Sequence, residues 1–190
     1  MFAVLLDTCV LWPSLQRDFL LSLAVEGLYR PLWSERILLE LEMSEQAKLV
    51  GRGDDELSAA SRARRLINVL ESRFDDALVM NWEPYEGSFG LPDLNDEHVV
   101  AAAVVGGAGA IVTDNLRDFP KDLLPDGLCV RSAAQFAADT VAVSPETALM
   151  ALQTMLRRYR NPFVTADEAL KILASRYRMD EAVELLSAVR

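Results

Sequence analysis

The run from Asp93 to Asn115, DLNDEHVVAAAVVGGAGAIVTDN, constrains the fold more than any other part of the chain. Asn95 is suited to cap a helix, and the apolar residues that follow it recur at helical spacing until Gly106-Gly107. Residues 110–112 then form a short apolar strand that leads directly into the polar residues 113–115. A helix with an acidic start that leads into such a strand is typical of an α/β protein.

The beginning of the chain repeats this arrangement. Phe2–Leu6 is an uninterrupted apolar run, the pattern of a strand buried on both faces of a parallel sheet, and Asp7 follows it directly. Parallel strands place their carboxyl ends at one edge of a sheet, where α/β proteins gather their chemistry. We therefore expect Asp7, Asp96 and residues 113–115 to meet there, although an isolated aspartate at a helix start is more often only a cap.

The remaining patterns predict further elements in the same style. Helices are expected over residues 8–23, 35–49, 56–73 and 132–142, and strands over 29–33, 77–82 and 128–131. This alternation predicts a three-layer α/β/α fold with a mainly parallel sheet over residues 1–142. Composition shifts near Ser144, and residues 143–190 are predicted to form a separate C-terminal segment of three helices, with a break at Asn161-Pro162.

Composition limits the class of protein. With 190 residues, 51% hydrophobic and 25% charged, the chain is expected to be globular. It has no run near the ~18 apolar residues of a membrane span, and no signal-peptide pattern, so we expect a cytoplasmic protein without a membrane partner. Cys9 and Cys129 form no zinc or disulfide pattern.

The net charge of −10 leaves two interpretations open. Either no nucleic acid binds, or acidic residues hold a metal while basic residues form local patches. Two groups of arginines are candidate RNA-binding patches: Arg62, Arg64 and Arg65 in one helix, and Arg157, Arg158 and Arg160 in the C-terminal segment. The alternatives are a solvated face for the first group and a partner-binding surface for the second.

The acidic residues at the predicted sheet edge suggest a metal site. Asp7, Asp96, Asp114 and one glutamate of the helix over residues 35–49 are candidates, and helical periodicity does not choose between Glu40 and Glu42. Carboxylates that lie close together repel one another, so such a group normally requires a cation. Oxygen-only ligands favour Mg²⁺ or Mn²⁺, the usual ions for phosphodiester hydrolysis.

Four segments, in this order, resemble the PIN-domain ribonucleases, most closely the VapC-type toxins of bacterial toxin–antitoxin pairs. They are Phe2–Leu6 with Asp7-Thr8, Ser34-x-x-x-x-x-Glu40-Leu41, Asp93-x-x-Asp96-x-His98-x-x-x-Ala102, and Ile111-Val-Thr113-Asp-Asn115-Leu-Arg-Asp-Phe119. The resemblance covers residues 1–140. It implies a Mg²⁺- or Mn²⁺-dependent endoribonuclease that hydrolyses RNA with a metal-activated water, a cognate antitoxin, and a homodimer.

The resemblance also implies roles for individual residues. Asp7, Glu40, Asp96 and Asp114 would be the catalytic, metal-binding acids, supported by Thr113 and Asn115. The order Thr113-Asp114-Asn115 departs from the common Thr-Gly-Asp pattern, so Asp114, Asn115 and Asp118 all remain candidates for the fourth position. We predict Asp114, partly because the amide of Asn115 carries no charge.

Three other functions are considered. A haloacid-dehalogenase-type phosphatase needs an aspartate where this chain has Cys9, and a phospho-receiver domain needs one where it has Asn81-Trp82. A catalytically weak PIN-like module that binds RNA or a partner protein is the serious alternative, because of the unusual fourth position.

Overall fold

The computed structural model describes residues 1–160 and 163–190, so the predicted helix break at Asn161-Pro162 lies outside the described residues. Within these ranges, five short strands form a single sheet in the order β3-β2-β1-β4-β5. The strands are β1 (Ala3–Leu6), β2 (Arg30–Ser34), β3 (Leu78–Val79), β4 (Ala110–Val112) and β5 (Cys129–Arg131). All neighbouring pairs are parallel, which confirms the predicted sheet.

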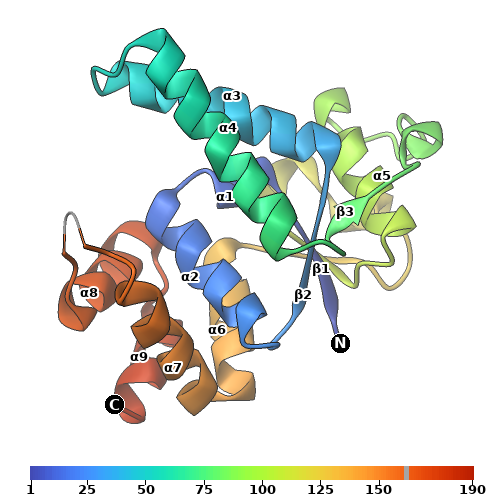
Figure 1. Ribbon diagram of the computed structural model, residues 1–190. Coiled ribbons are helices and arrows are strands. Elements are labelled where there is room, and N and C mark those ends of the chain that lie inside the picture. The colour runs from blue at the N-terminus through green and yellow to red at the C-terminus, as the bar shows by residue number, and fades with distance from the viewer. Residues whose placement is uncertain (161–162) are drawn as a thin grey trace.

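Helices cover both faces of the sheet. They are α1 (Thr8–Leu11), α2 (Ser14–Val25), α3 (Glu35–Gly51), α4 (Glu56–Arg73), α5 (Glu97–Val105) and α6 (Ala133–Val143). Helix α5 packs on β1, β2 and β4 from one side, while α2 and α6 lie on the other side (Figure 1). The predicted three-layer α/β/α arrangement is therefore confirmed.

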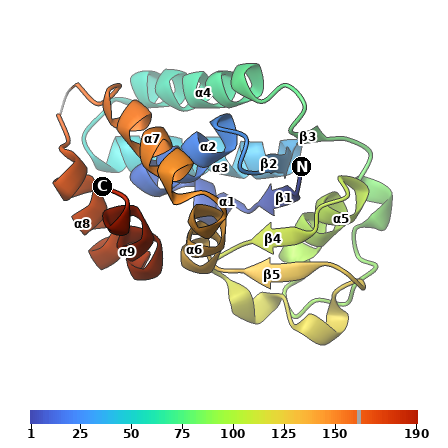
Figure 2. The same cartoon turned by 90° about the horizontal axis from the view of Figure 1, so that it is seen from below.

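The C-terminal helices share the hydrophobic core of the rest of the chain. They are α7 (Pro145–Leu156), α8 (Ala166–Tyr177) and α9 (Asp180–Ala188), which lie together beside α2 and α6 (Figure 2). Leu152 and Leu173 are completely buried, and Thr165 and Glu168 form a capping box at the start of α8. The division into residues 1–142 and 143–190 remains a prediction; α6 ends at Val143 and α7 begins two residues later.

Two predicted elements are interrupted. The single helix expected over residues 8–23 is wrong, because Pro13 separates α1 from α2: proline has no N–H to continue the hydrogen-bond ladder of α1. The strand expected over residues 77–82 is reduced to β3, since Asn81 has a φ of 61° and cannot extend a strand.

The start and the end of α5 are both tightly determined. Asn95 is not the predicted cap: a 3₁₀ turn over Leu94–Asp96 precedes α5, and the Asp93 side chain caps that turn by accepting the Asn95 N–H. At the other end, a Cβ on Gly106 would lie 2.8 Å from a Val79 methyl carbon and 2.9 Å from one of Leu32. Glycine is thus required where α5 packs against the strands.

The part of the chain that the structure describes contains no helix with both the length and the apolar character needed to cross a lipid bilayer. The longest helices, α3 and α4, carry many charged residues.

Candidate active site

The site lies where the direction of the sheet changes. The chain leaves β1 toward β2 on one side and leaves β4 toward β5 on the other, so the carboxyl ends of β1 and β4 form a topological switch point, where α/β proteins bind ligands. Leu6 pairs with Val112 in the sheet, so the next residues, Asp7 and Thr113, are brought together. The Thr113 hydroxyl donates a hydrogen bond of 2.7 Å to Oδ2 of Asp7, and the Asp7 side chain is largely buried.

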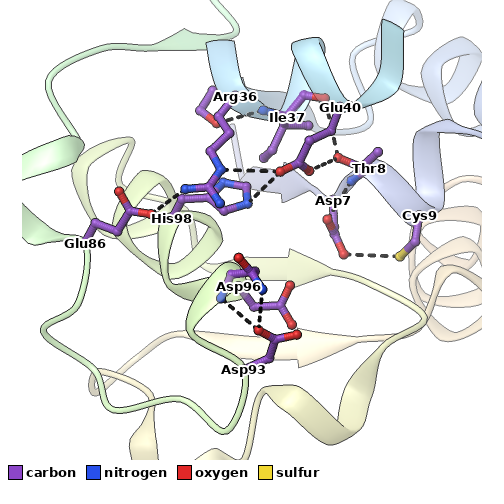
Figure 3. Close-up of polar contacts among 12 residues, drawn as sticks. Asp7, Thr8, Cys9, Arg36, Ile37, Glu40, Glu86, Asp93, Asp96 and His98 are labelled. Carbon is purple, nitrogen blue, oxygen red and sulfur yellow. Dashed lines mark hydrogen bonds and ion pairs between the residues drawn. The ribbon is translucent and has the colours of Figure 1, made fainter. Parts of the chain in front are cut away.

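Thr8 connects Asp7 to α3. Its backbone N–H donates to Oδ1 of Asp7 at 2.6 Å, and its hydroxyl donates to Oε2 of Glu40 at 2.8 Å (Figure 3). Glu42 instead forms an ion pair of 2.9 Å with Arg64 of α4. The structure therefore brings Glu40, and not Glu42, to the sheet edge.

Glu40 is held on its other side by His98 and Arg36. Nε2 of His98 lies 3.3 Å from Oε1 of Glu40, and Nε of Arg36 lies 3.4 Å from the same atom (Figure 3). Burial alone would raise the pKa of Glu40, but the hydrogen bonds from His98 and Thr8 and the charges of His98 and Arg36 outweigh it and hold this pKa below its usual value. Glu40 is thus ionised at neutral pH.

Asp96 lies in a second part of the site, among other carboxylates. Asp93, Asp96 and Asp118 place carboxylate oxygens within 4.8 Å of one another; we call these three residues the acidic cluster. Burial first, and then the charges of Asp7, Asp93 and Asp118, raise the pKa of Asp96 to about 6. Asp7, which follows β1, and Asp96, which precedes α5, are therefore close enough to interact.

The three candidates for the fourth acidic position make different contacts. Oδ1 of Asp114 accepts the backbone N–H of Ala133 at 3.0 Å, so this carboxylate binds the start of α6. Nδ2 of Asn115 donates to Asp96 at 3.3 Å and also to Asp118. Asp118, one of the three open candidates, is the one whose carboxylate joins the acidic cluster.

The donor set fits a hard divalent cation. The acidic cluster offers only oxygen ligands, as Mg²⁺ and Mn²⁺ prefer, and Asp7 supplies a further carboxylate beside it. Burial is the main cause of the raised pKa of Asp96, and the repulsion by Asp7, Asp93 and Asp118 that adds to it is what a bound cation would relieve.

Three residues that sequence reasoning assigned no catalytic role support the site. The side chain of Glu97, only 1% exposed, accepts the backbone N–H groups of Phe89 and Leu91 at 3.0 and 2.8 Å and so fixes the loop over residues 83–94. Arg36 joins the same loop to α3 through an ion pair of 2.5 Å with Glu86. Asp93 adds a carboxylate to the acidic cluster. Its spacing of three residues from Asp96, about one helical turn, is the sequence feature that could have identified it.

The candidate RNA-binding arginines lie outside this site. Arg62 pairs with Asp54 and Arg64 with Glu42, both within the α3–α4 hairpin, and Arg65 is exposed on α4. Arg158 and Arg160 line a hollow of about 650 Å³ between α2, α4 and α7, while Arg157 is exposed at the end of α7. Among the described residues, none of the six forms an ion pair with the acidic cluster.

Comparison with known proteins adds one match. A family model described as PIN domain matches residues 3–117, more than half of the chain, and this segment contains Asp7, Glu40 and Asp96. Helices α7, α8 and α9 lie outside the matched segment. No curated protein and no solved structure matches the chain.

Proposed function

The chain belongs to the PIN-domain family, and on this premise we propose that it is a Mg²⁺- or Mn²⁺-dependent endoribonuclease that acts as the toxin of a toxin–antitoxin pair. The family is generally one of metal-dependent nucleases, and the acidic cluster is suited to hold such a metal. RNA as substrate, a cognate antitoxin as partner, a cytoplasmic location and a homodimer are parts of this proposal.

One observation carries the proposal: acidic side chains from four separate segments meet at the carboxyl edge of the sheet. Asp7 follows β1, Glu40 lies on α3, Asp93 and Asp96 precede α5, and Asp118 follows β4. Carboxylates this close are costly without a cation, and the raised pKa of Asp96 records part of that cost. We therefore assign Asp7, Asp96 and Asp118 to the metal, with Glu40 beside them.

The chemistry supported by these residues is hydrolysis by water. A bound Mg²⁺ or Mn²⁺ would polarise the phosphoryl oxygen and increase the acidity of a water molecule. Thr8 and Thr113 hold the carboxylates of Glu40 and Asp7 in place through their hydroxyl groups. The thiol of Cys9 lies against Asp7, and burial together with the Asp7 charge raises its pKa to about 12, so it stays protonated and is a poor nucleophile.

The decisive experiment measures RNA cleavage by the purified protein during titration with Mn²⁺. We expect cleavage that requires metal and is lost in Asp7→Asn and Asp96→Asn, while Asp114→Asn, which makes the same change of charge outside the acidic cluster, keeps it. Circular dichroism must show that all three variants are folded. Full activity in a folded Asp7→Asn variant would contradict the assignment.

The toxin role requires a separate test in cells. We expect expression of the protein to arrest growth and Asp96→Asn to relieve the arrest. A small antitoxin-like reading frame beside the gene would support the pairing, and co-expression of its product should restore growth. An arrest that persists in Asp96→Asn would contradict a toxic activity based on RNA cleavage.

One observation favours the second candidate, a weakly catalytic module that binds RNA or a protein. The Asn115 amide donates to both Asp96 and Asp118 and so supplies part of the bridging that a cation would provide. Calorimetric titration with Mn²⁺ separates the two functions. Binding that depends on Asp7 supports the nuclease, and no carboxylate-dependent binding at millimolar Mn²⁺ supports the module.

A further inference from the structure

A hollow of about 310 Å³ lies between the end of α3, the turn that joins α1 to α2, and α8. Its lining includes three aromatic and three cationic side chains, namely Trp12, Tyr159 and Tyr177, and Lys48, Arg52 and Arg176. We call it the aromatic–basic hollow. Within the described part of the chain, no acidic residue lines it.

The local charge is opposite to that of the whole chain. The neighbouring 650 Å³ hollow shares Tyr159 and adds four arginines, Arg17, Arg73, Arg158 and Arg160, with Asp18 as its acidic residue. The two hollows together are lined by seven of the chain's 19 Lys and Arg residues, but by one of its 29 Asp and Glu residues. The basic residues of this acidic protein are thus concentrated where the C-terminal helices meet the PIN domain, as in a phosphate-binding surface.

Trp12 is presented as a fixed, accessible ring. Its indole N–H donates to the Ser44 carbonyl at 3.2 Å. The Lys48 ammonium donates to the backbone carbonyl of Trp12 at 3.4 Å and lies 5.5 Å from the Trp12 ring centroid. The residue nevertheless remains 40% exposed. A rigid aromatic surface of this kind suits the stacking of a nucleic-acid base.

The cations differ in their availability. Lys48 forms an ion pair with Glu45, so its charge is already balanced. Arg52 and Arg176 are exposed and, among the described residues, have no acidic side chain within salt-bridge distance. The Arg176 guanidinium lies 5.6 Å from the Tyr177 ring centroid. Two cations are therefore free to bind phosphate beside aromatic rings.

The hollow is connected to the active site through α1. The backbone N–H of Trp12 donates to the carbonyl of Thr8 at 2.9 Å, and Thr8 also binds Glu40. One helical turn, about 5.4 Å along the axis, therefore separates Trp12 from the residue that connects Asp7 and Glu40. The aromatic–basic hollow therefore begins one helical turn from the residue that binds both Asp7 and Glu40.

We propose that the aromatic–basic hollow is a secondary binding site for single-stranded RNA that holds the substrate strand beside the acidic cluster. This proposal rests on the proposed nuclease function. Bases are available for stacking on Trp12 only in single strands, and Arg52 and Arg176 bind the backbone. Because Arg176 and Tyr177 belong to α8, outside the matched PIN segment, the C-terminal helices supply part of the substrate-binding surface.

The first test measures binding of a fluorescein-labelled 12-nucleotide single-stranded RNA by anisotropy, in EDTA to prevent cleavage. We expect Arg176→Glu to weaken binding about fivefold or more, and to reduce the salt slope of log K by about 0.7 for the lost phosphate contact. Lys171→Glu is the matched control, because it makes the same charge change on an exposed position of α8 that does not line the hollow. We expect it to change the affinity less than twofold.

The second test concerns stacking and the coupling to cleavage. We expect Trp12→Ala to weaken binding of the 12-nucleotide RNA about tenfold, and Trp12→Phe, which keeps an aromatic ring, to restore most of the affinity. In cleavage assays, Arg176→Glu should raise KM for the 12-nucleotide RNA without changing kcat, and leave a trinucleotide substrate unaffected.

Two results would overturn the proposal: equal losses in Arg176→Glu and Lys171→Glu, or unchanged RNA affinity in both Arg176→Glu and Trp12→Ala. Failure of the proposed function has a different signature. In that case neither the parent protein nor any variant would cleave either RNA with Mn²⁺, although Arg176→Glu and Trp12→Ala would still weaken RNA binding.

Discussion

Replacement of Asp118 by asparagine tests which residue completes the acidic site. Asparagine keeps a side-chain oxygen that can accept the hydrogen bond from Asn115, so the change removes one charge with little change in shape. In the metal-free protein, Asp118 lies with Asp93 and Asp96 within 4.8 Å and raises the pKa of Asp96. The substitution should therefore stabilise the metal-free protein while weakening its affinity for metal.

The magnitude follows from the geometry. Two unit charges 4.8 Å apart repel by about 1 kcal/mol in a water-like dielectric, which is appropriate for a partly exposed pair. For a chain of 190 residues this corresponds to an increase in Tm of about 2–4 °C in EDTA. Mn²⁺ at a hundred times its Kd would stabilise the parent protein by about 2.7 kcal/mol, and a tenfold weaker affinity in the variant halves that gain.

The assay is thermal unfolding with EDTA and with Mn²⁺, and Asp114→Asn is the matched control. It makes the same charge change four residues away, and its asparagine oxygen can still accept the Ala133 N–H. We expect the control to change neither Tm nor the Mn²⁺ response by more than about 0.5 kcal/mol. An Asp118→Asn variant with a lower Tm in EDTA and an undiminished Mn²⁺ shift would refute the assignment. If Asp114→Asn instead raised the Tm in EDTA and weakened the Mn²⁺ shift, Asp114 would be restored to the site.

Three further changes test other parts of the structure. Because the folded-state pKa of Asp96 is raised to about 6, the folded protein binds a proton that the unfolded chain releases between about pH 4 and pH 6. The free energy of unfolding without metal should therefore fall as pH rises through this range, and Asp96→Asn should remove this pH dependence in urea titrations. Glu97→Gln should lower the free energy of unfolding by about 2 kcal/mol and increase hydrogen exchange in the loop over residues 83–94, because an amide cannot accept both N–H groups equally well. Gly106→Ala should cost about 2 kcal/mol by overpacking against β2 and β3, whereas Gly51→Ala, which meets nothing within 4 Å at the end of α3, should gain roughly 0.5 kcal/mol in the same denaturation assay.

The sheet was predictable because its strands are apolar runs that end at polar residues. Phe2–Leu6 and residues 110–112 have this pattern, and their polar ends, Asp7 and Thr113, form a hydrogen bond in the structure. The location of Asp96 was expected from a different pattern, the acidic start of the helix that leads into residues 110–112. Periodicity could not choose between Glu40 and Glu42, because they lie at opposite edges of one apolar stripe. That choice depends on tertiary partners: Thr8 and His98 bind Glu40, whereas α4 offers Arg64 to Glu42.

Local backbone geometry accounts for the predictions that were wrong. One helix was predicted over residues 8–23, but Pro13 ends α1 and leaves Trp12 at a turn. Asn95 is a residue type suited to a cap, yet Asp93 takes this role because a 3₁₀ turn starts at Leu94, two residues before the helix was expected to begin. Each difference depends on a single turn, and sequence patterns averaged over several residues do not detect it.

The fourth acidic position illustrates how such a turn changes the assignment of a site. Successive residues at a strand end point in different directions, so once Thr113 faces Asp7, Asp114 is turned toward α6. The Thr113 hydroxyl also accepts the N–H of Asn115, and the 3₁₀ turn that follows, Leu116–Asp118, brings the chain back over the sheet edge. Asp118 reaches the cluster by this route, so the acid lies five residues after Thr113 instead of one. The contact that a side chain makes with Asp96 is thus more important than its distance in sequence from the strand. Asp118→Ala should lose Mn²⁺ binding, and the added change Asn115→Asp should recover it, since residue 115 already contacts Asp96. No recovery in a folded double variant would show that the turn, and not the contact, determines where the acid must lie.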